Sequence, residues 1–178
     1  MIDMNKVLRI IGSSKNVYDL LVNSYIRPSH PYKLRGTVNR SAPLYTTELY
    51  TRIIEEGRVP SVDDYSRTFS EKYFPRKDKD SARIQANIAY KSLLTEIHFY
   101  FLLRESGQFD EVKMSFDHDI LVKSDVLITK NGVSIGLQLF SGDETYVNTK
   151  IVTIGRFNAG TTLAYPLHAL PLKGRCIY

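Results

Sequence analysis

Two carboxylates stand where an acidic side chain is unusual, and each could take part in chemistry. Asp125 interrupts the apolar run from Ile120 to Ile128, which has the composition of a β-strand although Asp is a poor strand former. Glu96 follows Leu93 by three residues, close to the apolar stripe of a predicted helix, where a carboxylate needs a partner. Both are therefore candidate site residues. The alternative for Asp125 is an exposed strand edge. The alternatives for Glu96 are a structural ion pair or plain exposure at the edge of the apolar stripe.

Other residues of suitable type have more ordinary interpretations. Asp117-His118-Asp119 places three ligand-type residues in a row, but its position between two predicted strands favours a tight turn. His98 lies among aromatic residues of a predicted helix and His168 near a predicted strand, so both are interpreted as packed histidines. The signatures of serine hydrolases, zincins and phosphate-binding loops are absent from the sequence.

Periodicity and punctuation divide the chain into a helical segment, residues 1–80, and a mixed segment, residues 81–178. In the first, apolar residues recur at helical spacing around Gly12, with Ser14 as the predicted cap of a second helix. A loop rich in proline and glycine follows at 28–43. A third helix then ends at Gly57, and a fourth opens at a capping box, Ser61 to Asp64, and closes at Pro75.

The second segment is predicted to alternate helix and strand. A charged loop at 76–80 precedes a long helix at 82–105, with Ser81 as its cap. Strands are predicted at 111–116, 119–129 and 133–140, a helix at 141–157 and a last strand at 161–170, where Pro166 favours an edge or a bulge. Because Asn131-Gly132 is the favoured dipeptide of a two-residue hairpin, the second and third strands should be antiparallel neighbours.

This order of elements resembles the core of the PD-(D/E)XK nucleases, which have the restriction-endonuclease-like fold. In that family a helix carboxylate, an Asp on the second strand, and a Glu, Asp or Gln on the third, followed two residues later by Lys, surround a divalent metal. Glu96, Asp125 and Gln138 match the first three positions, and the resemblance covers about half of the chain. It implies an α/β (α+β) protein with an αβββαβ core, a mixed sheet flanked by helices and an N-terminal helical extension.

The match departs from the family pattern at three points. No proline precedes Asp125, the third-strand acid is Gln138, and Phe140 stands where the family has its lysine. Some members supply that lysine from another element, which makes Lys150, on the predicted helix after the third strand, the first substitute. Lys123, two residues before Asp125, is the second.

The resemblance implies a metal-dependent endonuclease that hydrolyses phosphodiester bonds through a water held on Mg²⁺ or Mn²⁺. Asp125, Gln138 and Glu96 would be oxygen ligands of the kind that these hard cations take, and Lys150 would stabilise developing charge. One alternative is a catalytically decayed module on the same fold, which binds nucleic acid or a protein. Another is a structural or assembly protein in which twelve tyrosines and eight phenylalanines serve packing and a partner surface.

A basic loop supports a nucleic-acid partner. Between Asp19 and Glu48 the sequence contains no acid, and its cations there are Arg27, Lys33, Arg35 and Arg40. Cations interleaved with tyrosines suit a phosphate backbone with occasional base stacking, and the alternative is a solvated loop. We expect DNA before RNA as the partner and leave assembly as a homodimer or larger oligomer open.

The composition limits the classes of protein to which this chain can belong. The 178 residues carry a formal charge of +5, which favours polyanions without establishing one. Residues 1–80 hold fourteen basic and ten acidic groups, so most of the surplus is amino-terminal. The single cysteine, Cys176, excludes an intramolecular disulfide and a cysteine zinc site. Since no segment resembles a signal peptide or a membrane span, we expect a cytoplasmic protein without a membrane partner.

Overall fold

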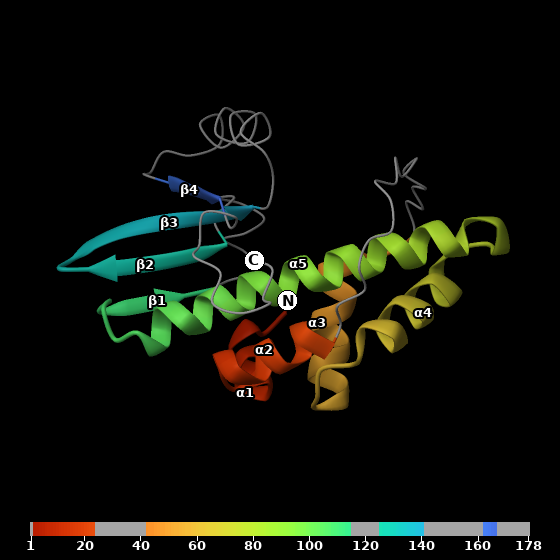
Figure 1. The fold of residues 1–178 in the computed structure, drawn as a ribbon, viewed down its shortest axis with the longest axis horizontal. Helices are drawn as coiled ribbons and strands as arrows, with labels where there is room; N and C mark the ends of the chain where they lie inside the picture. Colours follow the sequence, from red (N-terminus) through yellow and green to blue (C-terminus); the bar gives the residue numbers. More distant parts are fainter. Residues whose placement is uncertain (1, 24–41, 115–124, 141–161, 167–178) are drawn as a thin grey trace. The chain divides into compact units, whose positions relative to one another are not determined.

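A computed structural model describes residues 2–23, 42–114, 125–140 and 162–166 (Figure 1). Within these residues the chain has a mixed α+β fold, with an N-terminal helical region followed by a small sheet. It forms two compact units, Met1–Ile97 and His98–Tyr178, and one long helix continues from the first into the second. The division at residue 80 that we predict from the sequence stays a prediction.

The elements follow one another in the order of their labels in Figure 1. The helices are α1 (Met4–Ile11), α2 (Ser14–Asn23), α3 (Tyr45–Glu56), α4 (Val62–Tyr73) and α5 (Lys79–Glu105), and a short 3-10 turn, η1 (Arg76–Asp78), precedes α5. The strands are β1 (Glu111–Lys113), β2 (Val126–Lys130), β3 (Val133–Phe140) and β4 (Thr162–Pro166).

Glycine and serine set several helix ends where the sequence predicts them. Gly12 ends α1 with a φ of 89°, and Gly57 ends α3 with a φ of 66°, both in the region that favours glycine. At the start of α4 the side chain of Ser61 accepts a hydrogen bond from the backbone N of Asp64 at 3.2 Å. The predicted break after α1, the end of α3 and the cap of α4 are thereby confirmed.

Two predicted helix starts are wrong. The cap of α2 is Ser13, whose Oγ accepts a hydrogen bond from the backbone N of Asn16 at 3.3 Å, and Ser14 is the first helical residue. The long helix α5 begins at Lys79 instead of at residue 82, so the predicted charged loop is occupied by η1 and the first turn of α5. The helix can start this early because no glycine or proline lies between Pro75 and Lys79. The negative charge of Asp80 is also favourable in the first turn of a helix.

An aromatic cluster fills the space between α3, α4 and α5. Phe69 of α4 is 1% exposed, and its ring centroid lies 4.5 Å from that of Tyr45. The hydroxyl of Tyr65 donates to the backbone oxygen of Tyr45 at 2.7 Å, and that of Tyr90 donates to the backbone oxygen of Pro60 at 2.8 Å. Burial raises the pKa of the Tyr65 and Tyr90 phenols, so both hydroxyls are stable as donors.

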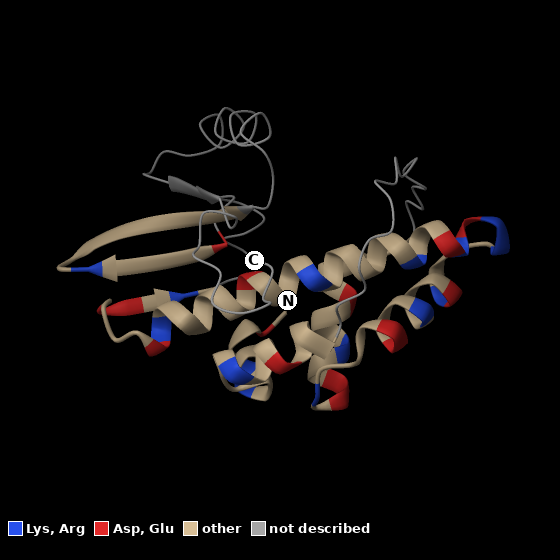
Figure 2. Ribbon diagram, viewed as in Figure 1, with Lys and Arg blue, Asp and Glu red and all other residues tan. Residues whose placement is uncertain are grey.

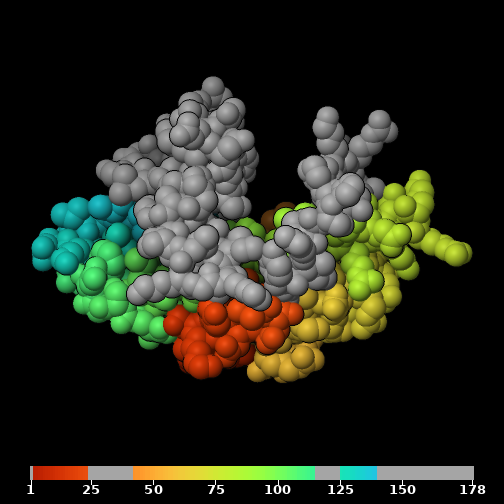
Figure 3. Space-filling model, viewed as in Figure 1, coloured from red at the N-terminus to blue at the C-terminus, as the bar shows by residue number. Residues whose placement is uncertain are grey.

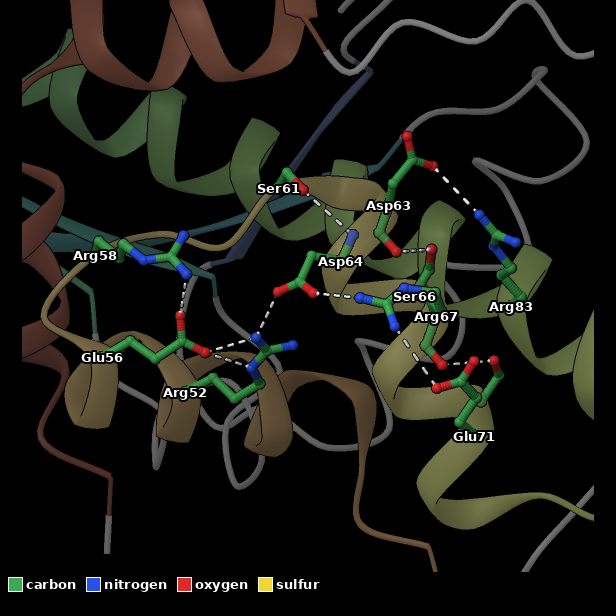
Figure 4. Close-up of polar contacts among 11 residues, drawn as sticks. Arg52, Glu56, Arg58, Ser61, Asp63, Asp64, Ser66, Arg67, Glu71 and Arg83 are labelled. Carbon is green, nitrogen blue, oxygen red and sulfur yellow. Dashed lines mark hydrogen bonds and ion pairs between the residues drawn. The ribbon is translucent and has the colours of Figure 1, made fainter.

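Ion pairs join the end of α3 to the start of α4 (Figure 4). Nη2 of Arg52 lies 2.7 Å from Oδ2 of Asp64 and 2.6 Å from Oε1 of Glu56. The hydrogen bond from Arg52 holds the pKa of the Asp64 carboxyl below its ordinary value. The network contains four arginines, Arg52, Arg58, Arg67 and Arg83, and four carboxylates, Glu56, Asp63, Asp64 and Glu71.

The ion-pair network carries equal numbers of positive and negative side chains, and this bears on whether it could bind nucleic acid. Figure 2 shows acidic and basic residues interspersed along α4, and four cations here face four anions. A neutral arrangement offers no net attraction to a polyanion. The network therefore joins helices. The basic loop at 27–43, of which residues 27–41 lie outside the described residues, stays the predicted contact with nucleic acid.

The helix α1 packs on α3. Val7 and Ile11 of α1 and Leu49 and Ile53 of α3 are buried, and the two helices are in contact. In Figure 3 the red residues of α1 and α2 lie beside the orange and yellow residues of α3 and α4. No helix in the described part of the chain combines the length and apolar character needed to cross a bilayer.

The strands form one sheet in the order β1-β2-β3-β4. The pairs β1/β2 and β2/β3 are antiparallel, and β3/β4 is parallel. Asn131 and Gly132 have φ values of 51° and 75°, the two positive values of a type I′ turn. The predicted hairpin is confirmed. Along β3, Leu137 and Leu139 are buried, whereas Val133 beside the turn is 62% exposed.

Parts of the sequence-based prediction fall on residues that are not described. These are the helix at 141–157, the strand residues 115–116, 119–124 and 167–170, and the strand start at 161. Of the described residues that were predicted as strand, all lie in strands except Met114, which follows β1, and Asp125, which precedes β2. Pro166 ends β4, which lies at one end of the order of described strands, as the predicted edge position requires.

Candidate active site

Asp125 lies immediately before β2 and is only 4% exposed. Its backbone N donates to the backbone oxygen of Leu137 at 2.9 Å, and Leu137 is also the register partner of Val126. Two residues of one strand therefore face one residue of its neighbour, which is the arrangement of a β-bulge. Bulges change the direction of a side chain at the end of a ladder, and the side chain here is the Asp125 carboxylate.

One oxygen of this carboxylate accepts two hydrogen bonds from β3. Oδ2 of Asp125 lies 2.7 Å from Nε2 of Gln138 and 2.5 Å from the backbone N of Leu139. A side-chain amide and a backbone N–H of the same strand therefore hold one carboxylate oxygen. Since Leu139 is 5% exposed, its N–H needs a protein partner, and the carboxylate takes the place of a strand carbonyl. Asp125 therefore has a structural role beside any chemical one.

Glu96 lies on α5 and is half-buried. Its Oε1 accepts a hydrogen bond from Oγ of Ser92, one helical turn earlier, at 3.3 Å. Glu96 belongs to the first compact unit, whereas Asp125 and Gln138 belong to the second. The structure thus brings together two of the three predicted oxygen ligands, and the convergence of Glu96 with them stays a prediction.

The remaining predicted site residues lie outside the described residues. They are Lys150 and Lys123 as candidate lysines, and Arg27, Lys33, Arg35 and Arg40 in the basic loop. The predicted turn at 117–119 and His168 also lie there. Phe140, which the resemblance to the nucleases puts at their lysine position, is the last residue of β3 and is in register with Pro166 of β4.

His98 is buried in α5, as the sequence predicts, with 3% of its surface exposed. Burial lowers the pKa of its imidazole, and the nearby charge of Glu105 opposes this effect. A buried neutral histidine is consistent with a packing role.

Stability should fall on acidification because of His98. In the unfolded chain its imidazole takes up a proton as the pH falls through about 6.5, whereas the folded chain resists protonation until a lower pH. Urea unfolding between about pH 7.5 and pH 5 should therefore show a steeper loss of stability for the parent than for His98→Gln. Equal pH dependence of the two chains would contradict a buried neutral His98.

The helical unit contains a buried carboxylate that was not predicted from the sequence. Glu48 of α3 is 8% exposed and accepts hydrogen bonds from the Tyr73 hydroxyl at 2.8 Å and from Nζ of Lys72 at 3.2 Å. Burial raises the pKa of the Tyr73 phenol. A signal existed in the sequence, since Glu48 adjoins Leu49 within the apolar stripe of the helix. With both donors on α4, this cluster joins two helices.

The donor set suits a hard cation. A carboxylate oxygen of Asp125 and the amide oxygen of Gln138 are ligands that Mg²⁺ and Mn²⁺ accept, and Mg²⁺ usually keeps several waters. Among the described residues no three His, Cys, Asp or Glu side chains form a group that could hold a metal. A site built there depends on Asp125, on the amide of Gln138 and on water, with Glu96 as the predicted third ligand.

Comparison of the chain with protein-family models, with curated proteins and with solved structures finds no match.

Proposed function

We propose that the chain is a metal-dependent endonuclease with a restriction-endonuclease-like core. The observation that carries this proposal is the pairing of Asp125 with Gln138 at 2.7 Å across β2 and β3. A buried carboxylate beside a carboxamide, at the end of an antiparallel pair, is the donor set expected for Mg²⁺ or Mn²⁺.

The order of the elements supports the same proposal. A long helix, α5, precedes the antiparallel strands β1 to β3, and β4 then pairs with β3 in parallel. This order is consistent with an αβββαβ core, whose second helix would fall between Phe140 and Thr162, outside the described residues. A parallel pair needs a crossover of about a dozen residues or more, and 21 residues separate β3 from β4.

In the proposed reaction each residue has a defined task. Asp125 provides fixed negative charge, because the backbone of Leu139 holds its carboxylate. Gln138 provides a neutral oxygen, Glu96 a second charge, and Lys150 or Lys123 a cation beside the reacting phosphate. When bound, Mg²⁺ or Mn²⁺ lowers the pKa of water and neutralises developing charge on the phosphate. The basic loop at 27–43 would hold the nucleic-acid backbone.

A second candidate is a decayed module that binds nucleic acid without cutting it. Two observations favour it. Phe140 occupies the position of the family lysine, and both donors from β3 already bond to Oδ2 of Asp125. In this case the Asp125 carboxylate would serve only to end the pairing of β2 with β3.

Cleavage of circular substrates distinguishes the two candidates. Single- and double-stranded circular DNA and a structured RNA would be incubated with the full chain in Mg²⁺, Mn²⁺ or EDTA. An endonuclease should convert a circle to nicked or linear product with the metals and leave it intact in EDTA. Binding to the same substrates without cleavage in either metal would support the decayed module.

A further inference from the structure

The Gln138 amide has its nitrogen, and not its oxygen, toward Asp125. Its Nε2 lies 2.7 Å from Oδ2 of Asp125. In this hydrogen bond Nε2 is the donor and the carboxylate oxygen is the acceptor, so the amide faces Asp125 with its NH₂ group. The amide oxygen, which is the atom that a hard cation requires, therefore lies on the side of the amide turned from that carboxylate oxygen.

The main chain of β3 fixes the carboxylate independently of this amide. The backbone N of Leu139 donates to Oδ2 at 2.5 Å, and the backbone N of Asp125 donates to Leu137 at 2.9 Å. Neither bond involves the side chain of Gln138. Rotation about the terminal torsion of a glutamine is soft, because that torsion has broad minima. The amide can therefore turn while Asp125 keeps its place.

We propose that Gln138 exchanges partners when a divalent cation binds. Without the cation its amide nitrogen donates to Asp125, and with Mg²⁺ or Mn²⁺ bound the amide turns so that its oxygen faces the cation. This inference rests on the proposed function, because it takes Asp125 and Gln138 as the cation site. The internal hydrogen bond then competes with the cation, so the apparent affinity is reduced by the small fraction of chains in which the amide is turned.

Side-chain amide resonances during a Mg²⁺ titration of the full chain test the exchange directly. The sequence contains only three glutamines, Gln85, Gln108 and Gln138, and Gln138→Met identifies one pair of signals by its loss. Gln108 is exposed and gives the position of an amide bonded to water. We expect the amide protons of Gln138 to move upfield toward the Gln108 position at saturation, while the backbone N–H of Leu139 stays downfield.

Two other outcomes would count against the proposal in different ways. If Mg²⁺ binds in a manner that Asp125→Asn removes, but the Gln138 amide signals stay where they are, the exchange is wrong and the cation site stands. If calorimetry finds no Mg²⁺ or Mn²⁺ binding that depends on Asp125, both the exchange and the nuclease proposal fail.

Gln138→Glu supplies an independent measurement. A carboxylate at this position needs no turn to present an oxygen, and it adds a charge, so Mn²⁺ affinity should rise about tenfold or more. Without metal the same variant should be less stable than the parent, because two carboxylates then face each other. Weaker Mn²⁺ binding by Gln138→Glu would overturn the proposal, since residue 138 would then not be a ligand.

Discussion

Asp125→Asn should abolish metal-dependent cleavage and leave the stability of the chain nearly unchanged. The substitution removes the negative charge that attracts a divalent cation, and loss of a metal ligand should reduce cleavage by at least about 100-fold. The Asn carbonyl oxygen can still accept the hydrogen bond from the backbone N of Leu139, so the end of the pairing between β2 and β3 is preserved. Cleavage of circular DNA measures the first effect, and urea unfolding measures the second.

Asp125→Ala should lose both activity and stability. Leu139 is buried, and without the carboxylate its backbone N–H has lost the acceptor that the structure gives it. An unsatisfied buried donor costs about 1–3 kcal/mol. If the Ala variant were as stable as the Asn variant, the bond to Leu139 would contribute nothing. If the Asn variant cut as fast as the parent, Asp125 would not be a metal ligand.

Asp110 offers a matched control for these variants. It is another carboxylate of the sheet unit that accepts a backbone hydrogen bond, since its Oδ2 lies 2.6 Å from the backbone N of Asn131. Asp110 bonds to the turn of the hairpin, whereas Asp125 lies at the other end of β2. Asp110→Asn should therefore retain full cleavage. Equal losses in both variants would indicate a general effect of removing charge from the sheet.

The opposition of Asp125 and Gln138 could be predicted from the sequence through the hairpin. A two-residue turn at 131–132 makes Lys130 the partner of Val133, and each further step moves one residue along both strands. Five steps lead from Lys130 to Asp125 and from Val133 to Gln138. The register confirms this as far as Val126 and Leu137. The bulge at Asp125 ends the regular pairing there, and the side chains of Asp125 and Gln138 still meet in a hydrogen bond. A local turn signal is therefore enough to expect that these two residues lie close together.

The bond between Asp125 and the backbone of Leu139 could not be predicted in this way. It depends on the bulge at Asp125, where regular pairing of β2 with β3 ends. Turn chemistry fixes where a ladder starts, but packing against the rest of the unit decides where it stops. The sequence therefore indicated a chemical role for Asp125 and gave no sign of its structural one.

The helices show the same difference between features set by neighbouring residues and features set by residues far apart in the chain. Gly57 and Ser61 act within one turn of the chain, and both predicted helix ends are confirmed. The hydrogen bond from Tyr73 to Glu48 and the ion pair of Arg52 with Asp64 join residues of different helices. Periodicity identifies the face of a helix but does not specify which residues of two packed faces meet.

Phe69→Ala should give the largest loss of stability among single substitutions in the helical unit. The ring is 1% exposed, and its centroid lies 4.5 Å from that of Tyr45 and 5.1 Å from that of Tyr73. Removing a buried phenyl ring costs about 3–5 kcal/mol, because the surrounding rings cannot close the cavity completely. A domain of this size is stable by only about 5–15 kcal/mol, so the midpoint of urea unfolding should fall sharply.

Two further variants keep this prediction testable if Phe69→Ala fails to fold. Phe69→Leu leaves a smaller cavity and should lie between the Ala variant and the parent. Ile88→Ala on α5 is the matched control, because Ile88 is 57% exposed and Ala favours a helix, so its cost should be near zero. Similar midpoints for Phe69→Leu, Ile88→Ala and the parent would mean that the aromatic cluster does not hold α3, α4 and α5 together. That result would also mean that the aromatic cluster does not hold in place the part of α5 that carries Glu96. The cluster and Glu96 both lie in the unit Met1–Ile97.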